Sequence, residues 1–595
     1  MRPRPIRSAL AFCLGALLCA LLPGTAPAQR SLGTLPTDPD SGITIEVVSL
    51  FDSPPPSGYL PLRIKVTNGS RRPGLWTVVL TERDHPSTFQ STERFAVDAR
   101  QSREIDLFLP IAPHEDAYRY LQGSVTGPGL IGSGSFVGNT QPLFGENGWG
   151  PAHGYVLLSR KLANAHRDTI NAALKQQAEA AKGKGGHLLR SVSGSAFDPA
   201  AFPTDVRALR GVTTVCASPE DLGALSPAQD AALSDWIAAG GRLLIAAHGT
   251  APASPPALAR KTVGRFGLGN IELTREPPTA ALLTETPQGE TQLRTASKPH
   301  HDEGTILELE WFAESITRPK IRPGLITALV LLFAAVIGPL NLFVLAPRAR
   351  RHLLFITTPL LALAATTIGL GAIFLHDGTG GRGNRAALLF PLPSGDRVLT
   401  LQSQTVRTGM LTSTRFATDP MAWMIPLSHS GSPFADTRRA GQFKTDGAQR
   451  SGDWFASRSR KAHLLDAIGP SRAGLHHLPA GGGRARPSVI SSFGGPMEQL
   501  FLRDEQGKWW RAENVGTGIE SQLQPVEERA ATDAIHDVRK ASGPRIDAAL
   551  TRWLEASAGS ARYVAWGPGG PDDFLQTLRA IRFRDRAIYM GEPTR

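Results

Sequence analysis

The sequence contains little cysteine. Of the three cysteines in 595 residues, Cys13 and Cys19 fall in a predicted export signal, which leaves Cys216 alone in the mature chain and excludes an intramolecular disulfide. The chain also lacks the patterns His-Glu-x-x-His, Cys-x-x-Cys, Gly-x-Ser-x-Gly and Gly-x-x-x-x-Gly-Lys-Ser/Thr. It therefore carries no motif of the common zinc, serine-hydrolase or nucleotide-binding sites, and we predict no metal and no cofactor.

The N-terminus predicts export. Arginines occupy positions 2, 4 and 7, an apolar stretch follows from Ala9 to Leu22, and Ala26-Pro27-Ala28 has the small-x-small form of a cleavage site. We predict a signal peptide over residues 1–28. Export places the residues that follow it outside the cytoplasm.

Two apolar runs in the middle of the chain predict a transmembrane hairpin. Pro323–Ala346 and Leu353–Leu375 contain no charged residue, and each is long enough, at about 1.5 Å rise per residue, to cross a hydrocarbon core of about 30 Å. The basic segment 347–352 between them is the predicted cytoplasmic loop. With an exported N-terminus, both large polar parts of the chain then lie on the outer side of the membrane.

Three residues of the first run have predicted roles in membrane packing. Gly338 and Pro339 predict a kink, because proline lacks a backbone donor and clashes with the preceding turn. Asn341 is the one strongly polar side chain in either run, and we expect it to hydrogen-bond to the second helix. Neither run contains an ionisable residue, which argues against a proton or ion pathway.

Residue patterns predict two modules before the apolar runs. In residues 42–140, the period-of-two alternation over Leu60–Thr67 favours an immunoglobulin-like β-sandwich. In residues 150–315, strands alternate with helices, which favours a parallel sheet with helices on its faces. The clearest helix of this module follows Ser226, where Gln229 completes a capping box.

Residues 384–595 predict a β-rich module with C-terminal helices. A β-hairpin is predicted where Gln499–Arg503 and Lys508–Val515 flank the turn residues 504–507. Residues 429–488 are rich in Gly, Ser, Pro and Arg, which predicts a flexible insert. The patterns together predict a multidomain α+β membrane protein with an Ig-like β-sandwich, an α/β domain, a two-helix transmembrane hairpin and a β-rich C-terminal domain.

The chain is basic. Its formal net charge is +12, and the arginines are scattered over the whole sequence. One interpretation is attraction to anionic lipid headgroups or cell-wall polymers. The other is the arginine bias of a GC-rich proteome, which needs no ligand and which we favour. The predicted export disfavours nucleic acid as a partner.

Three segments of the second module resemble a known group of proteins. Gly211–Ser218, Leu225–Gln229 and Trp236–Ile245 resemble the class I glutamine-amidotransferase-like (flavodoxin-like) domains of uncharacterised bacterial membrane proteins. The hairpin, with its Gly338-Pro-Leu-Asn341 and Thr358-Pro359 segments, is similar to the same group. The resemblance covers about residues 40–390. It implies a flavodoxin-like fold and a membrane location.

Cys216 and His248 are the candidate catalytic pair. Amidotransferases of this class hold a nucleophilic cysteine in a Gly-x-Cys-x-Gly elbow, with a histidine and a glutamate beside it. Cys216 lies in the run Thr214-Val-Cys-Ala-Ser218, which contains no glycine, so the elbow glycines are missing, and a small thiol packed in the core is the favoured interpretation. His248 follows the next predicted strand, at the edge where ligands of parallel sheets bind.

We predict a non-catalytic, membrane-anchored cell-envelope protein whose exported domains bind ligands or partners. Membrane lipid and an envelope or membrane protein are the predicted partners. The predicted location is the bacterial inner membrane, with the bulk of the chain in the periplasm. Two alternatives stay open: a cysteine-dependent hydrolase or amidotransferase-like enzyme that uses Cys216 and His248, and an accessory subunit of a transporter.

Overall fold

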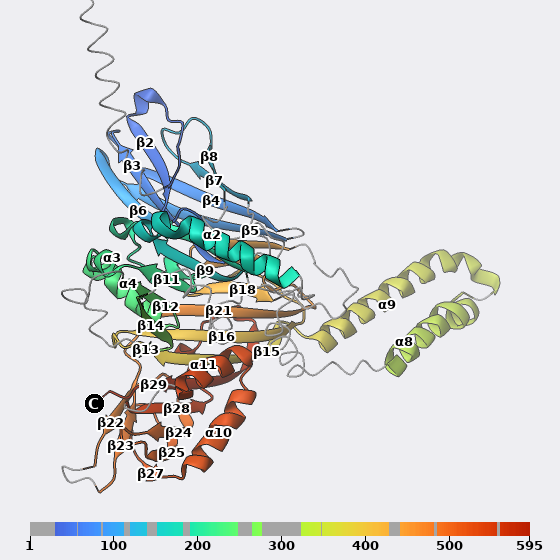
Figure 1. The fold of residues 1–595 in the computed structure, drawn as a ribbon. Coiled ribbons are helices and arrows are strands. Elements are labelled where there is room, and N and C mark those ends of the chain that lie inside the picture. Colours follow the sequence, from blue (N-terminus) through green and yellow to red (C-terminus); the bar gives the residue numbers. More distant parts are fainter. Residues whose placement is uncertain are drawn as a thin grey trace, which may run out of the picture.

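The computed structural model describes residues 30–55, 57–84, 87–111, 120–139, 152–182, 191–247, 264–275, 323–346, 348–427, 441–480, 485–555 and 560–594. The predicted signal peptide, residues 1–28, lies outside the described residues. The described chain forms five sheets. They are stacked along one long axis, and an apolar helical segment projects from the side of the stack (Figure 1).

An N-terminal β-sandwich forms from two facing sheets, one with the strand order β1-β2-β3-β6 and one that contains β4, β5, β7 and β8. In β3, the buried residues Leu62, Ile64 and Val66 alternate with more exposed ones and pack with Trp76 of β4. This alternation buries one face of each sheet against the other. The elements are β1 (Arg30–Thr34), a 3₁₀ turn (Pro39–Ser41), β2 (Ile43–Ser49), β3 (Gly58–Asn68), β4 (Gly74–Asp84), β5 (Ser87–Val97), β6 (Gln101–Ile111), β7 (Tyr120–Thr126) and β8 (Gly134–Asn139).

Strands from the C-terminal half complete the second sheet of the sandwich. β19 (Gln442–Asp446) pairs in parallel with β5, and β20 (Gln449–Gly452) and β17 (Phe416–Ala417) continue the sheet beyond it. The ring of Phe443 stacks on that of Phe89, with 4.7 Å between their centroids. The sandwich is therefore built from strands of both halves of the chain.

The predicted flexible insert over residues 429–488 is wrong for the part of it that the structure describes. β19, β20, β21 (Arg460–Pro470) and β22 (Leu475–Leu478) all lie within it, while residues 428–440 and 481–484 lie outside the described residues. The strands of this segment pair with distant partners, β19 with β5 and β21 with β16 (Arg397–Thr408). Local composition does not report such pairing, because strand formation depends on the neighbours that a strand meets.

The middle of the chain forms a six-stranded sheet in the order β10-β9-β11-β12-β14-β13, in which only β13 is antiparallel to its neighbour. Numbered along the chain, its parallel strands have the order 2-1-3-4-5 of doubly wound, flavodoxin-like sheets. The capping box predicted at Ser226 is confirmed, since the Gln229 side chain accepts from the Ser226 N–H at 2.8 Å. The elements are β9 (Ala152–Ser159), α2 (Arg160–Lys182), β10 (Ser191–Phe197), η2 (Pro199–Ala201), η3 (Val206–Leu209), β11 (Thr214–Ala217), α3 (Pro219–Gly223), α4 (Pro227–Ala238), β12 (Arg242–Ala246), β13 (Gly264–Phe266) and β14 (Gly269–Thr274).

The C-terminal part forms a nine-stranded sheet in the order β18-β21-β16-β15-β29-β28-β24-β25-β27, with a small sheet β22-β23-β26 beside it. Helices α10 and α11 pack on one face through Ile535, Leu550 and Trp553. The hairpin predicted around residues 504–507 is confirmed by the pairing of β24 with β25. The remaining elements are β15 (Gly381–Pro391), β18 (Trp423–Leu427), β23 (Ser488–Ser491), β24 (Met497–Arg503), β25 (Trp509–Val515), β26 (Glu520–Gln522), β27 (Gln524–Pro525), α10 (Glu528–Lys540), α11 (Pro544–Glu555), β28 (Arg562–Gly567), η6 (Pro571–Asp573) and β29 (Ile581–Gly591).

The predicted two-helix transmembrane hairpin is wrong. In the described part of the chain, one helix is long and apolar enough to cross a membrane, over Arg351–Gly369, and Val330–Leu345 is too short. The first apolar run breaks where the helix α8 (Pro323–Ala335) changes to a π-helix (Val336–Leu345) that contains Pro339. Proline has no N–H to donate to an α-helical ladder. At 1.5 Å per residue, α8 alone reaches only about 20 Å.

The predicted fold class, a multidomain α+β membrane protein, is corrected accordingly. The described chain is mostly β-sheet, its helices are few, and most of them are short. After a 3₁₀ turn (Arg348–Leu353), α9 (Leu354–Asp377) contains most of the one qualifying span. The predicted separate domains also share a core, in which Trp423 of the C-terminal sheet packs with Tyr59 of the sandwich and Trp236 of α4.

A buried ion cluster lies where these parts meet. The Asp466 side chain on β21 is 4% exposed, and it pairs with Arg210, which follows η3, and with Arg545 of α11 at 2.5 Å. The Arg210 guanidinium also lies over the Trp423 ring, 4.7 Å from its centroid. The buried guanidinium of Arg545 and the half-buried one of Arg210 therefore share one carboxylate, and the cluster joins three parts of the chain that are distant in the sequence.

We expect Asp466→Asn to destabilise the fold by about 3–5 kcal/mol, because removal of one partner leaves buried charges uncompensated. The measurement is the free energy of unfolding in guanidinium chloride. The matched control is Asp533→Asn on α10, whose side chain is 75% exposed and whose ion pair contributes little. Equal unfolding free energies for Asp466→Asn and the wild type would show that the cluster does not hold the parts together.

Candidate functional site

Cys216 lies in the core. It is 0% exposed on β11, packed among Val156, Leu158 and Leu244. Burial raises the pKa of Cys216 to about 12, so the thiol stays protonated at neutral pH and supplies no thiolate nucleophile. His248, the other member of the predicted pair, lies outside the described residues.

We expect Cys216 to resist alkylation in the folded protein. In a Cys13→Ser/Cys19→Ser background, iodoacetamide at pH 8 should modify no thiol until denaturant unfolds the chain, as measured by intact mass. The physical reason is the raised pKa together with complete burial. Rapid modification of the native protein would instead show that Cys216 is an accessible, activated thiol.

The predicted packing residues lie in the π-helix. Asn341 is 1% exposed; its Nδ2 donates to Thr358 Oγ1 at 2.9 Å, and its Oδ1 accepts from Thr357 Oγ1 at 2.7 Å. Around Gly338 there is open space, since an added Cβ would meet no atom within 4 Å. Asn341 therefore connects the π-helix to the start of α9, whereas no described residue packs closely at the Cβ position of Gly338.

A line of four polar side chains, three of them buried, crosses the C-terminal sheet. Asp585 of β29 lies opposite Arg385 of β15, Arg385 opposite Gln404 of β16, and Gln404 opposite His463 of β21. Arg385 is 6% exposed, and Gln404 and His463 are fully buried. We call these four residues the polar line. Its members come from four strands and share one face of the sheet because directly paired residues point to the same side.

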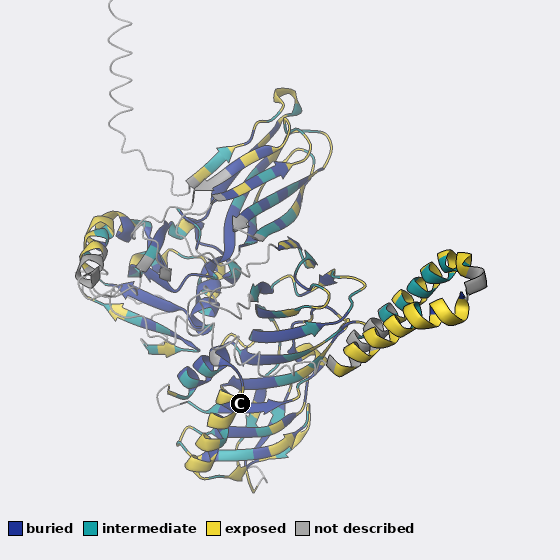
Figure 2. Ribbon diagram, turned by 90° about the vertical axis from the view of Figure 1, so that its right-hand side faces the viewer, coloured by how far each residue is buried: buried dark blue, intermediate teal, exposed yellow. Residues whose placement is uncertain are grey.

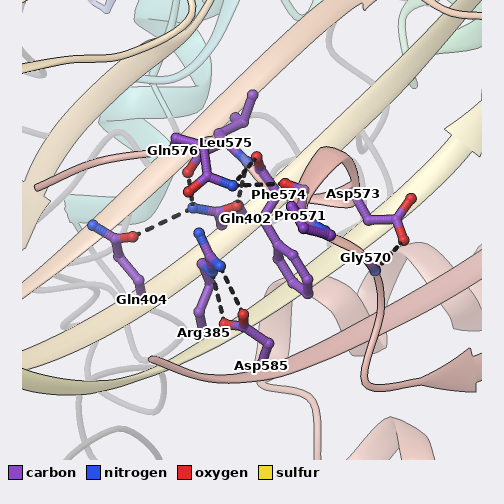
Figure 3. A network of polar contacts seen from close by, with 10 residues as sticks. All are labelled: Arg385, Gln402, Gln404, Gly570, Pro571, Asp573, Phe574, Leu575, Gln576 and Asp585. Carbon is purple, nitrogen blue, oxygen red and sulfur yellow. Dashed lines mark hydrogen bonds and ion pairs between the residues drawn. The ribbon is translucent and has the colours of Figure 1, made fainter. Parts of the chain in front are cut away.

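Arg385 is the charged centre of the polar line. Its Nε and Nη2 donate to the two carboxylate oxygens of Asp585 at 2.8 and 2.7 Å, as Figure 3 shows. The guanidinium plane also lies 4.2 Å from the centroid of the Phe574 ring and 4.8 Å from that of Phe583. A bidentate ion pair between two rings holds the side chain in one position.

The segment from Gly570 to Thr577 lies beside the polar line, with the Phe574 ring against Arg385. The side chain of Gln402, beside Gln404, donates to Leu575 O at 2.9 Å and accepts from Leu575 N at 2.8 Å (Figure 3). It therefore satisfies both backbone groups of Leu575, as a paired strand would. The Asp573 carboxylate fixes the near end by accepting from Gly570 N at 2.7 Å. The line is thus only partly hydrogen-bonded: among the described residues, Arg385 Nη1, Gln404 Nε2 and His463 Nδ1 have no hydrogen-bond partner.

His463 ends the polar line as a neutral side chain. Its Nε2 lies 2.8 Å from the carbonyl oxygen of Trp454, and because a carbonyl only accepts, Nε2 carries the proton. The centroid of the Phe455 ring lies 4.8 Å from that of the His463 ring. Burial lowers the pKa of His463 to about 3. The unfolded chain therefore binds a proton at this histidine between about pH 6.5 and 3, whereas the folded chain does not.

We expect His463 to lower stability in acid. Above about pH 6.5 the His463 side chain is neutral in both the folded and the unfolded chain. As the pH falls toward 3, the free energy of unfolding drops by up to about 1.4 kcal/mol per pH unit. His463→Gln should flatten the pH profile of the unfolding midpoint over this window. His536→Gln, an exposed position on α10, is the control and should keep the wild-type slope. Parallel profiles for His463→Gln and the wild type would contradict the assignment.

A small cavity lies beside the Asp466 cluster. Its volume is about 50 Å³, and its lining includes Tyr59, Arg210, Trp423 and Asp466. One water needs about 10–15 Å³ on this measure, and organic ligands occupy sites of about 300–1,000 Å³. The cavity therefore has the size of a few water molecules at the junction of the modules and does not fit an organic substrate.

The described residues contain no group of three His, Cys, Asp or Glu side chains placed to hold a metal ion. Of the two histidine pairs in the sequence, His300-His301 lies outside the described residues. His476 of the other pair contacts the C-terminal tail, with its Nδ1 2.7 Å from Thr594 Oγ1.

Sequence reasoning missed the polar line, because only the strand register brings its members together.

Comparisons with known proteins do not identify this chain. No protein-family model matches it, and no curated protein matches it. Among solved structures it is similar to the yeast delta-COP-I mu-homology domain complexed with a Dsl1 WxWxV peptide, with 9% identity over 36% of this chain and 97% of that chain and a TM-score of 0.17. It is also similar to a calcium-binding mutant of Bacteroides uniformis beta-glucuronidase 2, with 10% identity over 93% of this chain and 61% of that chain and a TM-score of 0.13.

These TM-scores are too low to carry an argument about fold or function. The resemblance to amidotransferase-like membrane proteins therefore stays a prediction.

Proposed function

We propose that this chain is a non-catalytic, membrane-attached binding protein, a rigid β-rich body held at a lipid surface by α9. The observation that carries the proposal is the exposed apolar surface of α9. No residue in the most apolar part of the span Arg351–Gly369 is buried, and Figure 2 shows the helix standing clear of the body. The body then presents its sandwich and α/β sheet to ligands or partner proteins.

The exposure of α9 favours contact with lipid over a role as a core helix or a signal sequence. A helix in the core of a soluble protein is mostly buried, and a signal sequence lies near the N-terminus, whereas this span begins at residue 351 and is unburied. Leu360, Leu363 and Ile368 are 58%, 65% and 66% exposed. Large apolar surfaces of this kind mark sites that meet a membrane or another protein.

The shared sheets constrain how the body sits at the membrane. β5 precedes the apolar segment and β19 follows it, yet the two strands pair in one sheet. A sheet cannot be divided by a bilayer, because its backbone groups must stay paired. In this proposal the whole body therefore lies on one side of the lipid. The export signal predicted for residues 1–28 makes that side the periplasmic face of the inner membrane.

The buried chemistry of the chain supports binding over catalysis. Cys216 is packed in the core with its pKa raised to about 12. Gln402, beside the polar line, uses its side chain to bind Leu575, and the junction cavity of about 50 Å³ is too small for a substrate. Within the described ranges, these features stabilise the body and leave its outer surfaces for recognition.

Flotation with phosphatidylcholine vesicles tests the proposal. We expect the full chain to float with the vesicles and Leu360→Lys/Leu363→Lys/Ile368→Lys to lose at least about tenfold in bound fraction, because each lysine in an apolar span is costly. The control, Leu75→Lys/Ile131→Lys, changes apolar residues that are 58% and 60% exposed on the sandwich and should float as the wild type does. If the α9 variant also floats as the wild type does, the proposal is wrong.

A further inference from the structure

The C-terminal sheet carries a row of like charges on the face opposite the polar line. Arg582 of β29 lies opposite Arg382 of β15, Arg382 opposite Arg407 of β16, and Arg407 opposite Arg460 of β21. Directly paired residues point to the same side of a sheet, so four guanidinium groups line one face across four adjacent strands. Arg584 extends this patch along β29. We call these five residues the arginine row.

The arginine row has no carboxylate partner among the residues that the structure describes. Four of its members are exposed and Arg407 is half-buried. Like charges directly opposite one another destabilise a sheet, and nothing in the described chain offsets the repulsion. On the other face, by contrast, Arg385 is matched by Asp585. An unmatched row of cations is expected of a surface that meets an anionic partner.

The row lies at the base of α9. α9 ends at Asp377 and β15 begins at Gly381, and four Cα steps span at most about 14 Å. Gly380 makes this connection tight: its φ is 89°, and an added Cβ would lie 2.2 Å from the Ala580 carbonyl oxygen. Arg382 is the second residue of β15, so the row lies on the side of the body from which α9 projects (Figure 1).

We propose that the arginine row is a docking surface for the phosphate groups of anionic phospholipids. The inference rests on the proposed function, in which α9 reaches a bilayer and so brings this face to headgroup level. One guanidinium group can donate two parallel hydrogen bonds to the oxygens of one phosphate. An anionic leaflet also attracts basic groups that lie within a Debye length of it, about 8–10 Å. α9 supplies the apolar contact, and the row sets the orientation of the body on the lipid.

Vesicles that differ only in charge test this inference. The full chain is titrated with phosphatidylcholine vesicles with and without phosphatidylglycerol, at low and high salt. Each arginine near an anionic surface contributes about fivefold in affinity, so Arg382→Gln/Arg407→Gln/Arg582→Gln should lose about 100-fold of the preference for anionic vesicles. Its binding to neutral vesicles should stay unchanged, and its salt dependence should weaken.

A matched control removes the same charge elsewhere. Arg71, Arg72 and Arg103 are exposed at the end of the sandwich distant from the module junction, since Gly58 at the other end of β3 lies against Arg210. Changing these three arginines to glutamine should leave the anionic preference at the wild-type value. Loss of the preference in this control as well would mean that net charge acts without a docking surface, and would overturn the inference.

The outcomes separate the inference from the proposed function. An unchanged anionic preference in the row variant overturns the docking surface, while loss of flotation in the α9 lysine variant still supports membrane attachment. Release from anionic vesicles by millimolar inorganic phosphate at constant ionic strength would identify a site for free phosphate and would also overturn it. The row variant should unfold at the wild-type midpoint or above, because it loses like-charge repulsion, so weaker binding would not reflect misfolding.

Discussion

The register of four adjacent strands, β29, β15, β16 and β21, is the constraint on which the rest of the structure depends. On one face it brings Arg385, Gln404 and His463 into a buried line, and on the other it brings the arginine row to solvent. A slip of one residue in any of these strands would exchange the two faces and bury unmatched arginines. The same register places Asp466 where Arg210 reaches it from outside the sheet.

Pairing between distant segments makes the described chain one body. β19 extends the N-terminal sandwich, and the Asp466 cluster ties the C-terminal sheet to the loop after η3 and to α11. In the sequence, this body contains strands from both sides of the apolar segment. A body with an exposed apolar helix and a cationic surface at its base is suited to a fixed orientation on a membrane.

Signals that act within a few residues predicted local structure well. The capping box of Ser226 and Gln229 begins α4, and the turn at residues 504–507 joins β24 to β25. Prediction failed where the outcome depends on distant partners or on one disruptive residue. The segment 429–488 forms strands because β5 and β16 pair with it, and the first apolar run breaks around Pro339. The polar line was missed because its members are far apart in the chain and carry no motif.

By itself, the sequence determined the alternation of β3, the cap of α4, the apolar character of α9 and the missing elbow around Cys216. Hydrogen bonds and apolar periodicity over about a dozen residues set these features. Only the tertiary structure decided that β19 joins the sandwich, that Cys216 is sealed in a core, and that five arginines lie together at the base of α9. These features depend on strand register, whose free energy comes from contacts between residues distant in the sequence.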